Sequence, residues 1–279
     1  MSVNPDEYCQ KKAVQSGSSF YYSFLFLPPE RRRAITALYA FCREVDDIVD
    51  ECTDTGVARA KLAWWQQELA RLYAGQPQHP VARALQPALQ PFGIKHEYLA
   101  EIIDGMEMDL NQNRYIDFPA LEQYCHRVAG VVGLLAASIF GYRDQQTLAF
   151  ARTLGLAFQL TNIIRDVGED GRKGRIYLPL SDLQEFKVSA ADILQARQSE
   201  SFVRLMTFQI ERAERHYAAA LEQLPEVDRK AQRPGLVMAA IYRTLLAEIE
   251  ADGCKVLTQR TALTPLRKLW IAWKTWMTA

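Results

Sequence analysis

The sequence predicts an all-α protein that forms one domain around a central apolar cavity. Apolar residues recur at helical spacing in segments throughout the 279 residues. No segment shows the alternation of apolar and polar residues that is typical of a strand, and no repeat period or hairpin signal stands out. Helices with one apolar side pack around a shared core, so we expect a single domain over residues 1–279.

The composition is that of a soluble globular protein, with 49% hydrophobic and 24% charged residues. The 33 basic and 33 acidic residues cancel, so the chain lacks the positive charge typical of nucleic-acid binding. The 5 cysteines show no C-x-x-C spacing, which favours reduced thiols in a cytoplasmic protein. No basic leader and no run of about 18 apolar residues occurs, so we expect neither a signal peptide nor a membrane span.

Residues 1–33 are expected to contain a short opening helix and a Ser/Gly-rich turn. Ser16-Gly17-Ser18-Ser19 has turn chemistry, and Pro28-Pro29 leads into the next helix. The hydroxyls and amides of this turn could bind phosphate oxygens, although a plain turn is the simpler interpretation.

The first acidic row closes an apolar segment, residues 34–42, that contains no Gly or Pro. At 3.6 residues per turn, one stripe of this helix carries Tyr39, Arg43, Asp46 and Asp50. Carboxylates at i and i+4 lie roughly 5–6 Å apart at Cβ and repel each other unless a cation lies between them. Mg²⁺ binds through one or two such carboxylates together with substrate phosphates. Taken alone, however, an acidic run of this kind is usually the solvated end of a surface helix.

Helical patterns follow near residues 57–75, 81–91 and 96–112, and the last of these is acidic along a side that includes Asp109. This acidic side favours a solvated face. Residues 119–141 are apolar and rich in small side chains. Small residues in a buried helix let helices approach closely or leave room for a ligand, and a cavity for a long apolar substrate would need such a wall.

The second acidic row lies in a long apolar segment, residues 146–170. Asn162, Asp166 and Asp170 recur at i, i+4 and i+8, on one face of a helix whose other side is apolar. Two rows of hard oxygen ligands on largely buried helices are difficult to explain as solvated faces. Together they predict a site for several Mg²⁺ ions that bind a diphosphate.

A basic segment, residues 171–179, then breaks this helix. It contains Arg172, Lys173 and Tyr177 next to the second acidic row, as a flap that closes over a diphosphate would. Helices resume further along the chain, over residues 189–223 and 232–254.

The last helix is expected within residues 262–278, and its segment 266–277 combines an apolar face with basic residues. The apolar face consists of Leu266, Leu269, Trp270, Trp273 and Met277. Either this helix docks on the body of the protein, or it lies in a membrane interface with Trp at the headgroups and basic residues toward anionic lipid. The second reading would make the protein peripheral at the inner face of the membrane.

These motifs resemble the squalene/phytoene synthase family of head-to-head prenyl transferases. The resemblance covers nearly the whole chain, through the segments Ser16–Phe20, Tyr39–Asp47, Tyr124–Gly133, Gln159–Asp170 and Tyr242. Two ordered acidic motifs, about 115 residues apart, make the resemblance specific. Residues 16–29 further resemble the bacterial presqualene diphosphate synthase branch, which serves hopanoid biosynthesis.

The resemblance implies an isoprenoid synthase fold and a defined set of site residues. The Mg²⁺ ligands would be Asp46, Asp50, Asn162, Asp166 and Asp170. The four aspartates and Tyr124 would be catalytic, and Tyr124 lies where the family has a tyrosine implicated in proton removal. The substrate would be bound by Ser19, Phe20, Tyr39, Arg43, Asp47, Gln159, Asn162, Arg165, Arg172, Lys173, Tyr177, Tyr242 and Arg260. The small residues 128–133 would line the prenyl pocket together with Gln159. Several relatives have basic residues where this chain has Ser16 and Ser18, so the resemblance leaves open which groups hold the second diphosphate.

The reaction implied is the condensation of two farnesyl diphosphates. One allylic diphosphate ionises, and Mg²⁺ and arginine stabilise the charge that develops on the leaving group. A closed apolar cavity protects the carbocation from water, and the ring faces of Phe20 and Tyr39 could stabilise it. C1 attacks the double bond of the second substrate, and loss of a proton closes the cyclopropane of presqualene diphosphate.

Three alternatives stay open from the sequence. A full squalene synthase would also reduce the intermediate with NADPH, which we do not expect because no Gly-rich dinucleotide motif occurs. A phytoene synthase would use geranylgeranyl diphosphate in a deeper pocket. A membrane-associated assembly factor without catalysis is disfavoured by the intact residues at all five ligand positions. In contrast to these three alternatives, the presqualene diphosphate synthase that the resemblance favours would pass its product to downstream pathway enzymes.

Overall fold

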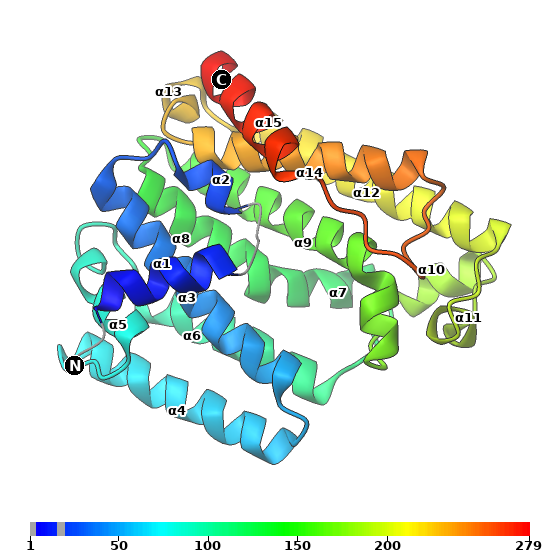
Figure 1. Ribbon diagram of the computed structural model, residues 1–279, viewed down its shortest axis with the longest axis horizontal. Helices are drawn as coiled ribbons and strands as arrows, with labels where there is room; N and C mark the ends of the chain where they lie inside the picture. The colour runs from blue at the N-terminus through cyan, green and yellow to red at the C-terminus, as the bar shows by residue number, and fades with distance from the viewer. Residues whose placement is uncertain (1–3, 16–19) are drawn as a thin grey trace.

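The computed structural model describes residues 4–15 and 20–279, and Figure 1 shows helices layered around the long helix α9. Within the described ranges the regular structure is helical, and β-pairing is limited to an isolated bridge between Arg114 and Ile176. The predicted all-α class is therefore confirmed.

The helices follow one another along the chain with short connections. They are α1 (Pro5–Gln15), α2 (Phe20–Phe24), α3 (Pro29–Glu51), α4 (Thr55–Tyr73), α5 (Pro80–Leu85), α6 (His96–Asn111), α7 (Phe118–Cys125), α8 (Val131–Phe140), α9 (Gln146–Arg172), α10 (Leu180–Glu185), α11 (Ala190–Leu194), α12 (Glu200–Gln223), α13 (Glu226–Arg229), α14 (Arg233–Ala251) and α15 (Pro265–Thr278). A 3₁₀ turn follows α5 at Gln86–Ala88, and a π-helical turn joins α7 to α8 at His126–Gly130.

Helix α9 lies at the centre of the fold (Figure 1). Helix α8 packs on one side of it, and the long helices α12 and α14 pack on another. The buried apolar side chains form two cores. One core unites α9 with α12 and α14, and the other unites α3 with α4, α5 and α6. The candidate site lies where these two cores face each other.

Helices α8 and α9 approach each other at glycines. A Cβ atom on Gly133 would lie 2.2 Å from the carbonyl oxygen of Ala151, and one on Gly155 would lie 2.4 Å from that of Ala129. Backbone therefore touches backbone, as expected for the small residues in this part of the sequence. The helix expected over 119–141 forms, and its backbone is helical from Phe118 to Phe140; it differs from a regular α-helix only in the π-helical turn at His126–Gly130.

Local capping explains a second difference from the expected elements. A helix was expected over residues 189–223, but the structure divides this range into α11 and α12. Ala196 adopts a left-handed conformation with φ of 52°, which ends the first helix. Ser199 then caps α12, accepting a hydrogen bond from the amide of Phe202 at 3.1 Å.

Membrane-spanning helices were also sought in the structure. Among the described residues, none of the helices is both long and apolar enough to cross a bilayer.

Candidate active site

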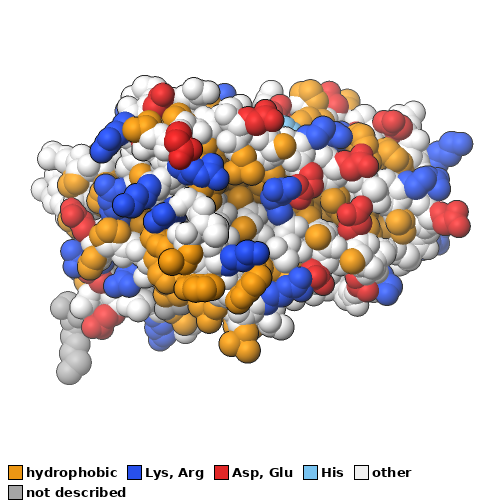
Figure 2. All heavy atoms as spheres, turned by 90° about the horizontal axis from the view of Figure 1, so that it is seen from above, with side chains coloured by type: hydrophobic (Ala, Val, Ile, Leu, Met, Phe, Trp, Pro, Cys, Tyr) orange, Lys and Arg blue, Asp and Glu red, His pale blue; other side chains and the backbone are white. Residues whose placement is uncertain are grey.

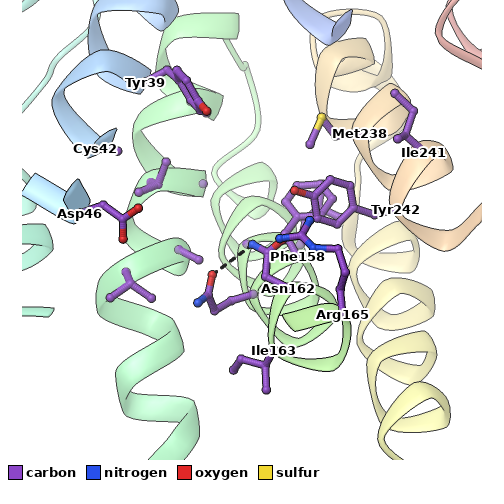
Figure 3. Close-up of a pocket in the computed structure, with 18 of the residues that line it drawn as sticks. Tyr39, Cys42, Asp46, Phe158, Asn162, Ile163, Arg165, Met238, Ile241 and Tyr242 are labelled. Atoms are coloured by element: carbon purple, nitrogen blue, oxygen red, sulfur yellow. Dashed lines mark hydrogen bonds between the residues drawn. The ribbon is translucent and has the colours of Figure 1, made fainter. Parts of the chain in front are cut away.

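A cavity of about 620 Å³ lies between α3, α8, α9 and α14. Its lining follows α9 from Phe150 to Asp170, which corresponds to about 30 Å of helix. Figure 3 shows side chains from three of these helices around the cavity, among them Asp46 of α3, Asn162 of α9 and Tyr242 of α14.

The two ends of the cavity differ in chemistry. The deep end is apolar and is lined by Phe24, Leu38, Val132, Phe140, Leu154 and Met238. The other end is charged and is lined by Arg43, Asp46, Asp50, Asp109, Arg165, Asp166, Asp170, Lys173, Arg175, Arg260 and Lys268. Such a cavity matches a ligand that joins a long apolar chain to a charged head.

The first acidic row, Asp46 and Asp50, faces the cavity from α3. Arg43 Nη1 donates to Asp46 at 2.6 Å, and the guanidinium also pairs with Asp47. Asp47 also forms an ion pair with Lys12 of α1, whose Nζ atom lies 2.9 Å from its carboxylate. Asp47 is not among the residues that line the cavity. The structure therefore separates Asp47 from the other candidate residues of this helix.

The second acidic row, Asn162, Asp166 and Asp170, faces the cavity from α9. Asp166 is bound by two arginines: Arg165 Nε donates to its Oδ1 atom at 2.7 Å, and Arg260 Nε donates to the same atom at 2.9 Å. The spacing of one helical turn places the whole row on one face, as predicted.

The remaining predicted residues of the cavity wall lie beside this row. Gln159 accepts a hydrogen bond from Asn162 Nδ2 at 3.4 Å, drawn as a dashed line in Figure 3. Tyr242 interacts with the guanidinium of Arg165, and Tyr39 faces the cavity from α3.

The basic segment after α9 bridges to the first acidic row. Arg175 Nη1 donates to Asp50 at 2.8 Å, and its Nη2 atom donates to the carbonyl of Val49 at 3.0 Å. Lys173 Nζ lies 3.2 Å from the other carboxylate oxygen of Asp50. Arg172 points elsewhere and donates to the carbonyl of Leu257 at 3.4 Å. The segment thus links the charged end of the cavity to α3, and Arg172 does not line it.

Asp109 joins two tyrosines at the cavity wall. Tyr124 Oη donates to one oxygen of this carboxylate and Tyr177 Oη to the other, both at 2.8 Å. The two rings stack with centroids 5.3 Å apart. The pKa of Tyr124 lies well above its ordinary value, because the phenol is buried and is close to Asp109. Tyr124 is therefore a hydrogen-bond donor whose proton has a defined acceptor.

The carboxylates of the two rows differ in their pKa values, and therefore in how strongly their surroundings favour the ionised form. Burial, together with repulsion from Asp50, raises the pKa of Asp46 to about 6 despite the nearby Arg43. Burial and repulsion from Asp166 and Asp50 raise the pKa of Asp170 to about 7. At Asp166 burial opposes ionisation, but hydrogen bonds from two arginines outweigh it and hold the pKa below its ordinary value.

The donor set fits divalent cations that prefer hard oxygen ligands. Burial and repulsion between the carboxylates raise the pKa values of Asp46 and Asp170, and a bound cation would offset both effects. Among the described residues, no three Asp, Glu, His or Cys side chains come close enough to enclose a metal without other ligands. This arrangement suits Mg²⁺, which keeps several waters and binds substrate phosphates in addition to one or two carboxylates.

Two predicted residues fall outside this description. Ser19 is not among the described residues, and Phe20 is described only as the first residue of α2. Conversely, sequence reasoning missed Asp109, Arg175 and Lys268. The expectation of a solvated face was wrong for Asp109, which lines the cavity beneath two tyrosines. The sequence signal for Asp109 was its position one helical turn after Gly105. In the structure, Gly105 packs closely against Arg127 and Val128.

The fold and the charged end over an apolar interior define the class of protein, an all-α isoprenoid synthase. More particularly, the chain belongs to the squalene/phytoene synthase family, whose profile matches residues 13–267. The family resemblance of the sequence motifs is thereby confirmed. The chain is an enzyme of this prenyl transferase family.

Two curated relatives carry the name phytoene synthase. The phytoene synthase of Arthrospira platensis is 36% identical over 94% of this chain and 89% of its own length. The 15-cis-phytoene synthase of Synechocystis sp. is also 36% identical, over 96% of this chain and 84% of its own length.

Among solved structures, a dehydrosqualene synthase superposes with a TM-score of 0.90 at 28% identity, over 98% of this chain and 96% of its own. The squalene synthase HpnC from Alicyclobacillus acidocaldarius gives a TM-score of 0.79 at 28% identity, over 89% of this chain and 94% of its own.

Proposed function

We propose that the enzyme condenses two prenyl diphosphates head to head, in a Mg²⁺-dependent reaction, to a cyclopropyl diphosphate and inorganic diphosphate. The observation that carries the proposal is a cavity in which two facing acidic rows and several arginines adjoin a long apolar interior. We name farnesyl diphosphate as the substrate and presqualene diphosphate as the product.

The charged end supports ionisation of the donor substrate. Arg165, Arg260 and Lys173 would bind diphosphate oxygens there, and their charges would stabilise the leaving group more strongly than the intact ester. The two acidic rows would hold Mg²⁺, which supplies Lewis-acid stabilisation to the same oxygens when bound. Arg175 and Lys173, which are paired with Asp50, would be available at this end to bind diphosphate oxygens as well.

The apolar interior supports the carbon–carbon step. C1 of the ionised donor is an allylic cation that water would quench. Next to the charged end that would hold its diphosphate, the cavity continues between apolar side chains from α3, α8 and α14. Attack on the acceptor's double bond forms one carbon–carbon bond, and loss of a proton closes the three-membered ring.

Tyr124 and Asp109 support removal of that proton. A phenol with a raised pKa is a poor base by itself, but Tyr124 can accept a proton on its oxygen while passing its own proton to Asp109. The pKa of Asp109 is raised to about 6 by burial, so this carboxylate is ionised near neutral pH and can receive the proton. We propose Asp109 as the terminal acceptor of this pair.

The substrate's chain length has two candidates, each with its own support. The solved neighbours named dehydrosqualene synthase and squalene synthase favour farnesyl diphosphate. The relatives named phytoene synthase favour geranylgeranyl diphosphate and a phytoene-type product.

The test is to incubate the purified protein with Mg²⁺ and either diphosphate, with and without NADPH, and to identify the products by mass spectrometry. Presqualene diphosphate from farnesyl diphosphate under both conditions supports the proposal. Squalene formed only with NADPH would assign a full squalene synthase, and turnover of geranylgeranyl diphosphate alone would assign the phytoene-type reaction. No turnover of either substrate would contradict catalysis and leave the assembly role.

A further inference from the structure

A buried amide lies at the deep end of the cavity, where the proposed reaction uses no polar group. Gln232 directly precedes α14, lines the cavity and is 1% exposed. Three residues further on, Gly235 packs on α9: a Cβ atom built on it would lie 3.3 Å from the side chain of Leu154 and 3.6 Å from that of Phe150. From Phe150, α9 runs roughly 24 Å before it reaches Asp166 of the second acidic row. Gln232 therefore lies far from the charged end.

The amide of Gln232 is held from one side. Its Nε2 atom donates to the carbonyl of Gly141 at 2.9 Å and to that of Ala137 at 3.3 Å, at the end of α8. These two acceptors fix the orientation of the amide, because its oxygen cannot donate to them. No described residue donates a hydrogen bond to Gln232 Oε1. Since Gln232 lines the cavity, a donor for this oxygen would have to come from inside the cavity.

The outer side of this region is covered by α2 and α15, which pack on each other and on α14. The ring of Phe26, just after α2, lies 5.2 Å from that of Trp276. Arg233, next to Gln232, donates from Nε to the carbonyl of Ala279 at 2.8 Å. Figure 2 views the molecule from the side on which α15 lies in Figure 1, and apolar side chains gather on that face. Bulk water therefore does not reach Gln232 from outside.

Given the proposed prenyl diphosphate substrates, on which this inference rests, we propose that Gln232 limits the length of the prenyl chain. An apolar chain end that covers Oε1 removes water from the oxygen and offers no donor in return, which costs free energy. An extended chain spans ~3.5 Å per three bonds, so one further isoprene unit, four bonds long, reaches roughly 4–5 Å deeper. Geranylgeranyl diphosphate would pay this cost, whereas farnesyl diphosphate leaves room for water beside the amide.

A limit set by polarity has a signature that a limit set by volume lacks. A longer chain with a hydroxyl at its far end would donate to Gln232 Oε1, and it would bind more tightly than the unmodified chain although it is larger. A ring such as Phe24, which lines the same end, would exclude both chains by their size.

The test is calorimetric titration of the full-length protein in Mg²⁺ with thiolodiphosphates, in which sulfur replaces the bridging oxygen at C1 so that the ligand resists ionisation. The three probes carry a farnesyl chain, a geranylgeranyl chain, and a geranylgeranyl chain with a terminal hydroxyl. We expect wild type to bind the farnesyl probe about tenfold more tightly than the geranylgeranyl probe, and the hydroxylated probe more tightly than its parent. Gln232→Leu should shift the farnesyl-to-geranylgeranyl ratio about tenfold toward geranylgeranyl and reverse the preference for the hydroxyl.

Gln209→Leu is the matched control. Gln209 is also a buried glutamine, and its Nε2 atom donates to Asp182 at 2.8 Å, but it does not line the cavity. Both substitutions leave buried partners without a hydrogen bond and should lower the melting temperature, yet Gln209→Leu should keep the affinity ratio of wild type. The stoichiometry of each titration corrects for unfolded protein.

Two kinds of failure are distinguishable. Binding with an unchanged ratio in Gln232→Leu, an equal shift in Gln209→Leu, or tighter binding of the geranylgeranyl probe by wild type would overturn the role of Gln232 alone. Binding of none of the probes by wild type would contradict the proposed function, and the role of Gln232 with it.

Discussion

The two acidic rows look alike in sequence and differ in their surroundings. On α9, Asp166 is bound by two arginines and has a lowered pKa. Asp170, one turn away, and Asp46 on α3 have raised pKa values of about 7 and about 6. Carboxylates at equal spacing can therefore differ in whether their surroundings favour the ionised form, as at Asp166, or disfavour it, as at Asp46 and Asp170. The disfavoured charges are those that a cation would stabilise most.

The largest expected effect separates Asp46 from Asp166. Asp46→Asn and Asp166→Asn should each lower turnover by about a thousandfold, because each removes a proposed Mg²⁺ ligand. Their effects on the metal-free fold should have opposite signs. Asp46→Asn removes a repelled carboxylate and should raise the melting temperature, whereas Asp166→Asn leaves buried Arg165 without its anion and should cost roughly 3 kcal/mol.

Turnover assays and thermal unfolding in chelator measure these two quantities. Asp192→Asn is a suitable control, because this half-buried aspartate lies in the capping box of the short helix α11 and pairs with Arg197, away from the cavity. Equal destabilisation by the Asp46 and Asp166 variants would contradict the charge difference between them.

A smaller effect concerns the basic segment that bridges to the first row. Arg175→Gln removes the hydrogen bond to Asp50 and should lower kcat/KM by about thirtyfold, the equivalent of about 2 kcal/mol for a charged hydrogen bond. Arg172→Gln, three positions earlier, should stay within about twofold of wild type because Arg172 lies outside the cavity lining. Steady-state kinetics with both variants decides whether position, rather than basic charge alone, matters in this segment.

The pH dependence of stability should report on Asp170. Its pKa in the folded protein, about 7, lies above the ordinary value of 3.8, so the folded state binds the extra proton between these values. Stability contributed by this proton is lost as the pH rises toward and through 7. Metal-free wild type should therefore lose stability relative to Asp170→Asn between about pH 5 and about pH 8. Urea unfolding of both proteins across this range measures the difference, and parallel curves would show that Asp170 titrates normally.

The smallest expected effect concerns the deep end of the cavity. Phe24→Ala removes one of the rings that close it and should shift preference toward geranylgeranyl diphosphate by about tenfold. Phe202→Ala is the matched control, because it truncates a fully buried ring in the core away from the cavity. Both variants should lose about 3 kcal/mol of stability, and competition between the two substrates distinguishes them. An unchanged ratio for Phe24→Ala would mean that this ring does not limit chain length.

The sequence predicted the helices and both acidic rows well, because helical spacing alone places Asp46 with Asp50 and Asn162 with Asp166 and Asp170. What spacing could not give is the partner of each charge. Asp47 adjoins Asp46 in sequence yet pairs with Lys12 of α1, and Arg260 reaches Asp166 from a loop far along the chain. Asp109 was misjudged for the same reason, since only the folded chain brings Tyr124 and Tyr177 over it.

The backbone contact between α8 and α9 has a consequence for altering this enzyme's substrate range. Gly133 and Gly155 leave no side chain to shorten, and a larger residue at either position would collide with a carbonyl oxygen. This side of the cavity can therefore be neither widened nor refilled by substitution at the glycines. Substitutions meant to change the prenyl chain length would instead fall on side chains that line the cavity, such as Phe24, Val132 and Met238. Library designs that spare the glycine contact and randomise those positions should keep the fold while sampling new chain lengths.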